Sequence, residues 1–152
     1  MNDASKITII ACISIAAIII TVISIAVPVK NTQESVQTAY SGVKREYWLF
    51  NSNIPEFNET KMGMPHDVFS MPVISVLKGD TVVIHFFNTE EPSGDHHSFT
   101  ILDKPYNINV ELSPGENKTI TFNANTTGVF TYYCTFHQPT MRGQLIVESP
   151  NS

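Results

Sequence analysis

The stretch GVFTYYCTFHQPTM, Gly128 to Met141, joins an alternating strand pattern to a loop that carries the imidazole of His137 and the thioether of Met141. Successive side chains of a strand point to opposite faces, so Phe130, Tyr132 and Cys134 are expected to share the inward face. A thiol therefore ends a predicted core strand. The imidazole and the thioether of the loop that follows can fold back over the same end of the core.

The sequence from Tyr47 onward consists of short β-branched and aromatic runs separated by turn residues, which predicts an all-β sandwich or barrel. The predicted strands are EYWLF, VISVL, TVVIHFF, HSFTIL, INVEL, KTITFN, VFTYYC and GQLIVE. Glycines in LKGD and SPGEN favour turns between them. The region from Asn51 to Met71 shows no clean alternation and is predicted to be a long loop or an extra hairpin.

The N-terminal part has a different character, because the run from Ile7 to Val27 carries no charge. A helix of about 20 apolar residues crosses a bilayer, so this run predicts a single-pass anchor. A cleaved signal is the alternative, although its apolar region would be unusually long. The expected organisation is a tail at 1–6, a transmembrane anchor at 7–27, a polar linker at 28–46 and a folded domain at 47–152.

Composition narrows the classes of partner. The chain has 152 residues, with 14 acidic and 9 basic side chains, and acidic residues outnumber basic ones about two to one from Tyr47 onward. No basic patch supports nucleic-acid binding. An acidic domain instead steers basic protein partners toward it.

A second histidine completes a plausible metal-binding set. In GDHHSFTIL, His97 alternates with two apolar residues on the face that enters the core, whereas His96 faces away. A thiolate, two imidazoles and a thioether are the ligand types that select copper, which makes His97, Cys134, His137 and Met141 the candidate ligands. A C-x2-H pair alone often arises by chance, and a methionine alone often fills a gap in the core. The prediction therefore rests on the combination of the cysteine, the two histidines and the methionine at these positions.

The remaining cysteine and histidines carry less information. Cys12 lies within the predicted anchor, so Cys134 has no partner for a disulfide in its own domain. His85 is opposite in phase to the apolar residues of its strand and is expected to face solvent. His66 lies in the irregular segment and is expected to be a surface imidazole, with a place in the lining of the site as the alternative.

These motifs together resemble the cupredoxin family. GVFTYYCTFHQPTM resembles the family's G-x-[YF]-x-[YF]-x-C-x2-H loop ending in Met, and LSPGENKTITF and VLKGDTVVIHFFN resemble its turns and strands. HSFTI is similar to the upstream ligand strand, as also in cytochrome oxidase subunit II. The resemblance covers Val73 to Glu148 and implies a Greek-key β-sandwich. It also implies one copper ion bound by His97, Cys134 and His137, with Met141 as a weak axial ligand.

Two departures from relatives and one further similarity shape this expectation. One departure is the spacing from His137 to Met141, which lies between those usual for amicyanin and plastocyanin and leaves the bond from Met141 open. The binuclear copper site of oxidase subunit II needs a second cysteine in the loop, and none follows Cys134, so one copper ion is implied. The loop is also similar to nitrosocyanin, a mononuclear cupredoxin with an open coordination position. If Met141 points away from the metal, the copper is either open or approached by Met64 or Met71.

The leading functional hypothesis is a type 1 copper protein that acts as a membrane-tethered electron carrier at the cell membrane, with its copper domain outside the cytoplasm. The sequons at Asn58, Asn117 and Asn125 are consistent with that side of the membrane. Redox proteins are the expected partners, and the acidic domain favours basic ones. The alternative is an open-site copper enzyme that acts on a small nitrogen oxide, and a copper-storage role for the methionine-rich segment ranks lowest.

Details of the carrier follow from the same motifs. The His137 ring is expected to be the edge through which an electron enters or leaves. A backbone N–H near Ser98 is expected to donate a hydrogen bond to the sulfur of Cys134. Phe136, Pro139 and Thr140 are expected to form an apolar docking patch around that edge.

Overall fold

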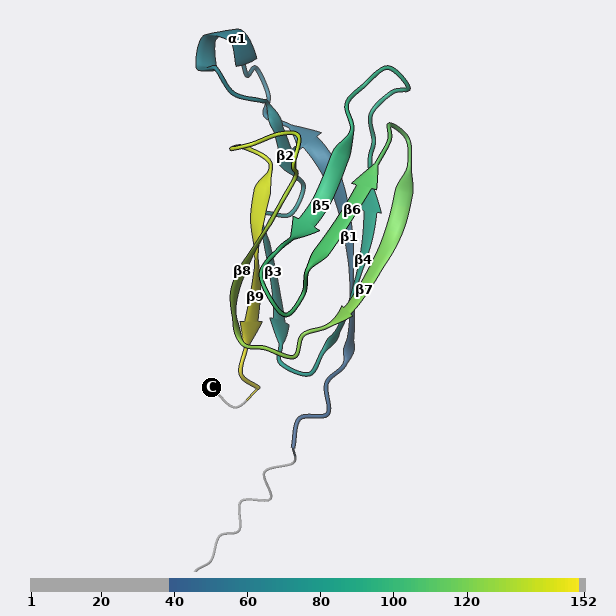
Figure 1. Cartoon of the computed structure of the whole chain (residues 1–152), viewed down its shortest axis with the longest axis vertical. Coiled ribbons are helices and arrows are strands. Elements are labelled where there is room, and N and C mark those ends of the chain that lie inside the picture. The colour runs from purple at the N-terminus through teal and green to yellow at the C-terminus, as the bar shows by residue number, and fades with distance from the viewer. Residues whose placement is uncertain (1–38, 151–152) are drawn as a thin grey trace, which may run out of the picture. The chain divides into compact units, whose positions relative to one another are not determined.

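The computed structural model describes residues 39–150, which belong to one compact unit. Two sheets pack face to face, a four-stranded sheet in the order β2-β1-β4-β7 and a five-stranded sheet in the order β3-β9-β8-β5-β6 (Figure 1). The elements are β1 (Lys44–Asn53), α1 (Glu59–Met62), β2 (Asp67–Phe69), β3 (Val73–Leu77), β4 (Thr81–Phe87), β5 (His97–Ile101), β6 (Ile108–Leu112), β7 (Asn117–Asn123), β8 (Gly128–Tyr133) and β9 (Arg142–Glu148). The predicted all-β sandwich is confirmed.

The core lies between the two sheets and follows from the alternation of apolar residues along each strand. In β9, for example, Gly143, Leu145 and Val147 are buried while Gln144 is exposed. All five residues of β5 are buried, and the hydroxyls of Ser98 and Thr100 are hydrogen-bonded to each other and to Thr135 and Asn109, respectively. The largest fully buried side chains are Tyr132, Phe86, Phe99, Leu49, Ile74, Ile84, Ile101, Leu112, Met141, Leu145, His97 and Val82.

One buried carboxylate links the residues just before and at the start of β1 to the rest of the sandwich. Asp80 accepts hydrogen bonds from the backbone N–H groups of Val43 (2.9 Å) and Leu77 (2.8 Å), from Arg45 Nε and from the Tyr40 hydroxyl. Burial opposes its ionisation, but these donors hold the pKa of Asp80 well below its usual range. The turn before β4 and the start of β1 are therefore joined by a single ionised side chain.

The first strand reaches further toward the N-terminus than its sequence pattern indicates. β1 begins at Lys44, inside the segment expected to be linker, and runs parallel to β4. The predicted anchor at 7–27, the tail at 1–6 and most of the linker lie outside the described residues. Within residues 39–150, no helix is long and apolar enough to span a membrane.

The irregular segment forms the predicted extra hairpin. The short helix α1 lies in it, and β2 pairs antiparallel with the end of β1, with Asn53 opposite Asp67. Figure 1 shows β2, the start of β5 and the loop between β8 and β9 at the same end of the sandwich. Segments that are far apart in the sequence therefore meet at that end.

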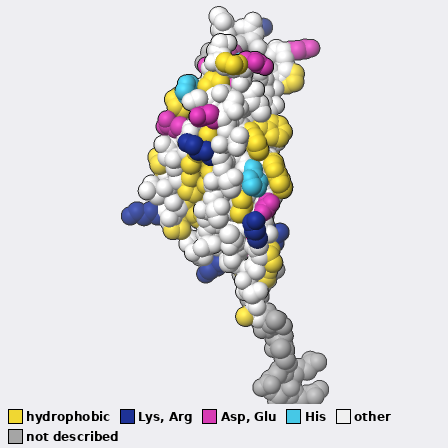
Figure 2. All heavy atoms as spheres, turned by 90° about the vertical axis from the view of Figure 1, so that its right-hand side faces the viewer, with side chains coloured by type: hydrophobic (Ala, Val, Ile, Leu, Met, Phe, Trp, Pro, Cys, Tyr) yellow, Lys and Arg dark blue, Asp and Glu magenta, His cyan; other side chains and the backbone are white. Residues whose placement is uncertain are grey.

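The outer face of the four-stranded sheet carries aromatic side chains. Trp48 is 56% exposed and stacks on His85 with ring centroids 5.1 Å apart, and Phe50 is also exposed. His85 is partly exposed on that outer face, in the phase expected from the sequence. Figure 2 shows hydrophobic side chains gathered beside a histidine at mid-height, and acidic side chains toward the upper end of this view.

Candidate metal centre

The end of β8 places a thiol inside the sandwich. Phe130, Tyr132 and Cys134 are buried and Val129 is exposed, as the alternation predicts. The Tyr132 ring stacks on Phe99 at a centroid distance of 5.2 Å. Cys134 is a free cysteine with no exposed surface, so its sulfur is held at the end of an aromatic column.

Two imidazoles face this sulfur. His97 opens β5 and is fully buried, and His137 follows Cys134 on the loop and is 9% exposed. The Nδ1 atom of His97 lies 3.9 Å from Cys134 Sγ, and the Nδ1 atom of His137 lies 3.5 Å from it. The two rings are 4.7 Å apart between centroids. The structure thus brings together the three strong ligands predicted from the sequence.

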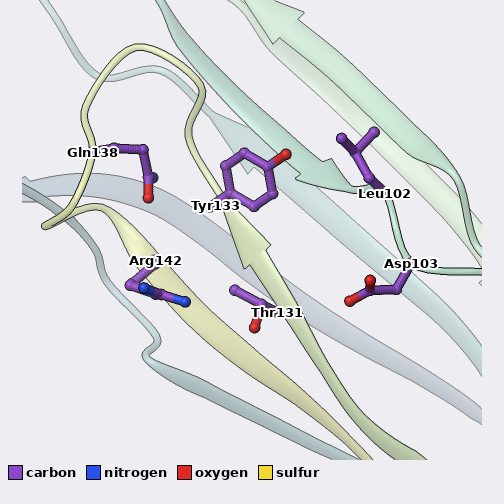
Figure 3. Close-up of a pocket in the computed structure, with 6 residues that line it drawn as sticks. All are labelled: Leu102, Asp103, Thr131, Tyr133, Gln138 and Arg142. Atoms are coloured by element: carbon purple, nitrogen blue, oxygen red, sulfur yellow. The ribbon is translucent and has the colours of Figure 1, made fainter.

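The loop that carries His137 is closed by hydrogen bonds. Met141 N donates to the carbonyl oxygen of His137 (2.9 Å), and Cys134 N donates to the carbonyl oxygen of Met141 (2.9 Å). The Gln138 side chain lies between the two arms of the loop (Figure 3) and donates from Nε2 to the carbonyl oxygens of Cys134 (2.7 Å) and Met141 (3.1 Å). The loop is therefore fastened at several points.

Met141 itself is fully buried. Its side chain belongs to the same apolar cluster as Cys134. Of the other two methionines considered, Met64 lines a hollow beside His137, whereas Met71 packs against the core and its carbonyl oxygen accepts a hydrogen bond from the Tyr132 hydroxyl. The axial role of Met141 stays a prediction.

A hydrogen bond to the sulfur also matches the sequence prediction. The backbone N–H of Ser98 donates to Cys134 Sγ at 3.3 Å. The Ser98 hydroxyl in turn accepts from the backbone N–H of Thr135 at 2.8 Å. A donor aimed at the sulfur stabilises a thiolate and tunes its bond to a metal.

The spacing of these atoms fits a bound metal ion. An ion about 2.0 Å from an imidazole nitrogen and about 2.3 Å from a thiolate, with bond angles of about 110–120°, separates the nitrogen and the sulfur by about 3.5–3.7 Å. The separations of 3.5 and 3.9 Å lie at or near this range. Together with the donor types, the geometry fits a copper site.

Carboxylates surround the opposite edges of the two rings. Asp67 Oδ1 lies 3.7 Å from His97 Nε2, and Asp67 Oδ2 lies 3.6 Å from His137 Nε2. Glu90 Oε1 lies 3.7 Å from His97 Nε2, and Asp95 Oδ2 lies 3.6 Å from His137 Nε2. Burial and the neighbouring His137 lower the pKa of His97 to about 4.

Asp67 is a residue of this site that the sequence pattern does not reveal. Its only signal was the short run Asp67–Phe69, which is too brief to be recognised as a strand. His66, the preceding residue, is partly exposed and pairs with Glu59 through Nδ1 at 2.5 Å. The hydrogen bond that the His66 ring donates to the Glu59 carboxylate raises the pKa of His66 above its usual value.

Two hollows flank the accessible edge of His137. One, of about 380 Å³, is lined by Glu59, Thr60, Met64, Pro65, Asp95 and His137. The other, of about 590 Å³, is lined by Asp95, His96, Glu111, Phe136 and His137. Phe136 is 49% exposed, with its ring centroid 6.5 Å from that of His137. The surroundings of this edge are therefore acidic with one exposed aromatic ring.

A third hollow, of about 320 Å³, lies behind the loop on the outer face of β8 and β9. Its lining residues are Leu102, Asp103, Thr131, Tyr133, Gln138 and Arg142 (Figure 3). It contains no histidine or cysteine, so it offers no alternative site with these soft ligands.

Known proteins resemble this chain in sequence and in fold. A family profile described as "Cupredoxin-like domain" matches residues 47–147. A nitrous-oxide reductase of Cupriavidus necator is 34% identical over 85 residues, which cover 53% of this chain and 13% of that protein. A copper nitrite reductase from Nitrosomonas europaea has a TM-score of 0.54 and 27% identity, covering 71% of this chain and 42% of that one. Rusticyanin from Thiobacillus ferrooxidans has a TM-score of 0.52 and 25% identity, covering 72% of this chain and 80% of that one. This chain thus spans less than half the length of the two reductases.

Proposed function

The chain belongs to the cupredoxin-like family, and from that premise we propose that it binds one copper ion and carries single electrons between redox partners. The proposed ligands are His97, Cys134 and His137, with Met141 as the weak axial ligand. The observation that carries the proposal is that two imidazole nitrogens face one buried sulfur at 3.5 and 3.9 Å. Copper bound by these groups supplies a one-electron couple between Cu(I) and Cu(II).

The protein frame suits a metal that changes charge without moving its ligands. His97 is part of a buried central strand, and Cys134 is hydrogen-bonded through its backbone and its sulfur. Gln138 fastens the loop that carries His137. A rigid set of ligands reduces the rearrangement that accompanies each change of oxidation state.

The accessible edge of His137 is the proposed route for electrons. It is the less buried of the two imidazoles, and Phe136 is exposed beside it. Pro139 and Thr140 continue this surface as the proposed docking patch. Because Glu59, Asp95 and other acidic residues line the adjoining hollows, we infer that the partners are basic redox proteins that associate briefly over a small interface.

Attachment to the cell membrane is part of the same proposal. The uncharged run from Ile7 to Val27 has the length and composition of a single-pass anchor, and we place the copper domain outside the cytoplasm. Extraction of the chain from membranes only by detergent, and digestion of the domain by protease added to intact cells, are the expected results. Release by salt alone would contradict the anchor.

The test of the copper proposal is spectroscopic. The chain loaded with Cu(II) should show an intense thiolate-to-copper absorption band and the EPR signal of one copper ion, and Cys134→Ser should abolish the band. A band that shifts in Met141→Ala supports the axial ligand, and an unchanged band removes Met141 from the ligand set. Absence of the band in the unmodified chain would refute the type 1 copper site.

A second candidate is an open copper site that acts on a small nitrogen oxide. Its support is the likeness to a copper nitrite reductase. Azide or nitric oxide that perturbs the copper spectrum would favour this activity. A copper spectrum that neither ligand changes would argue against this activity and favour electron transfer as the function.

A further inference from the structure

We propose that Asp67 is a positioning residue that orients both copper-binding histidines at once. The role deepens the proposed function and rests on it, because it concerns the ligands of the same metal. Each oxygen of the carboxylate faces the Nε2 atom of a different imidazole, Oδ1 toward His97 at 3.7 Å and Oδ2 toward His137 at 3.6 Å. One side chain therefore touches the outer edge of both rings.

The burial of Asp67 requires an explanation. The residue is only 2% exposed, and its Oδ2 atom is buried with no hydrogen-bond partner within residues 39–150. The Nε2 atom of His97 is also buried and unpartnered in that part of the chain. Buried polar atoms without partners are uncommon in folded proteins and often mark functional sites. The unpartnered Oδ2 atom faces Nε2 of His137, and the unpartnered Nε2 atom of His97 faces Oδ1 of the same carboxylate.

The backbone holds Asp67 in this place. It lies at the start of β2, opposite Asn53 at the end of β1. Two residues further on, Phe69 is buried in the core and packs against the Tyr132 ring at a centroid distance of 5.2 Å. The carboxylate is therefore carried by a paired strand whose other end is anchored in the aromatic core.

The chemistry of metal-bound histidine explains how a carboxylate at the position of Asp67 can act on the two imidazoles. An imidazole that binds a metal through Nδ1 carries its proton on Nε2, and a carboxylate facing that edge favours this tautomer and increases the donor strength of the ring. The separations exceed an ordinary hydrogen bond by about half an ångström, so the contact acts through charge. Because one carboxylate serves both rings, their orientations are coupled.

Two other carboxylates are weaker candidates for this role. Glu90 and Asp95 lie at 3.7 and 3.6 Å from the same edges, but their side chains are 25% and 70% exposed. Water screens charges at such positions far more than at a buried one. Asp67 is the only one of the three that is fully enclosed and that contacts both rings.

Two consequences follow for the bound copper. A negative charge at the outer edges of the ligands stabilises Cu(II) more than Cu(I), so Asp67 lowers the reduction potential. It also strengthens Cu(II) binding, because both rings are held in the binding orientation before the metal arrives. Replacing such a partner of a metal-bound histidine typically weakens metal affinity about 10–100-fold.

The test compares the full chain with Asp67→Asn and with Asp103→Asn. The control removes the same charge from an exposed position in the loop after β5, away from the histidines. We expect Asp67→Asn to weaken Cu(II) affinity, measured by competition with a chelator, about 10–100-fold. Its reduction potential should rise and its copper EPR signal should change, whereas Asp103→Asn should resemble the unmodified chain.

A measurement on the metal-free chain separates positioning from a structural role. Asn removes a buried charge that has no hydrogen-bond partner on Oδ2, so the unfolding midpoint of the metal-free variant should not fall. A large fall, or failure to fold, would overturn the positioning role. Affinity and potential equal to those of the control would overturn it as well. Absence of the thiolate-to-copper band in the unmodified chain would instead refute the proposed function.

Discussion

Replacement of Asp80 by Asn is expected to cost the domain about 3 kcal/mol of unfolding free energy. The Oδ1 atom accepts hydrogen bonds from the Tyr40 hydroxyl and Val43 N, and the Oδ2 atom accepts from Arg45 Nε and Leu77 N. An amide keeps one oxygen and turns the other position into a donor, so two of these bonds are lost. Hydrogen bonds to charged groups contribute about 1.5–3 kcal/mol each.

The lower end of that range applies, because the Arg45 side chain is 37% exposed and its bond competes with water. A loss of about 3 kcal/mol lowers the melting temperature by roughly 10–15 °C in a domain of this size. Urea unfolding followed by the fluorescence of Trp48, the single tryptophan of the chain, measures the change. Asp103→Asn, an exposed carboxylate, is the matched control and should change stability by less than about 0.5 kcal/mol.

The pH dependence gives a second check on Asp80. Its folded-state pKa is lowered, so its contribution is complete above its unfolded-state pKa of about 3.9 and is lost as the pH falls toward the folded value. The stability difference between the unmodified chain and Asp80→Asn should therefore be constant from about pH 6 to 8 and shrink below about pH 4. A difference under about 0.5 kcal/mol at pH 7, or one that does not shrink in acid, would refute the reasoning.

Three further predictions concern the loop, the core and the hairpin. Gln138→Ala removes two hydrogen bonds to loop carbonyls, so it should lower the unfolding free energy by about 1–2 kcal/mol and speed copper release to a chelator. An unchanged release rate would contradict the role of Gln138 in holding the loop. In Gly143→Ala the new Cβ would lie 2.3–2.5 Å from the Tyr132 ring, so overpacking of about 1–3 kcal/mol should appear in thermal unfolding, and a neutral result would mean that the ring can move aside. Because the pKa of His66 is raised, its contact with Glu59 stabilises the hairpin fully below about pH 6.5 and less as the pH rises through the pKa of the folded state. Protease cleavage of the hairpin should therefore increase over that pH range. Glu59→Gln should make the cleavage rate less dependent on pH.

Much of the sandwich was predictable because its strands are long enough for alternation to be read. Each predicted strand is present, and the phase of β8 correctly assigned the buried positions of Phe130, Tyr132 and Cys134. The approach of His97 to Cys134 was predictable for the same reason, since both lie at ends of strands whose inward faces were known. Their binding of copper stays a prediction that the proposed spectra test.

Other features could not be read from the local pattern. β2 has three residues, which is too short for a period of two to stand out from chance, so Asp67 was not recognised. The role of Asp80 depends on hydrogen-bond donors up to 40 positions away in the sequence, and no local sequence pattern predicts such partners. The strand β1 was expected to be shorter because the polar residues Lys44 and Arg45 look like linker, although pairing with β4 includes them.

The course of β1 has a geometric consequence for access to the copper end. The strand begins beside the Asp80 cluster and ends opposite Asp67, and its ten residues span about 30 Å at about 3.3 Å per residue. The ligand loop thus projects from the far end of the domain, a full strand length from the point where the chain enters. A partner that docks on the ligand loop therefore contacts the end of the domain opposite Lys44, about 30 Å from the first residue of β1.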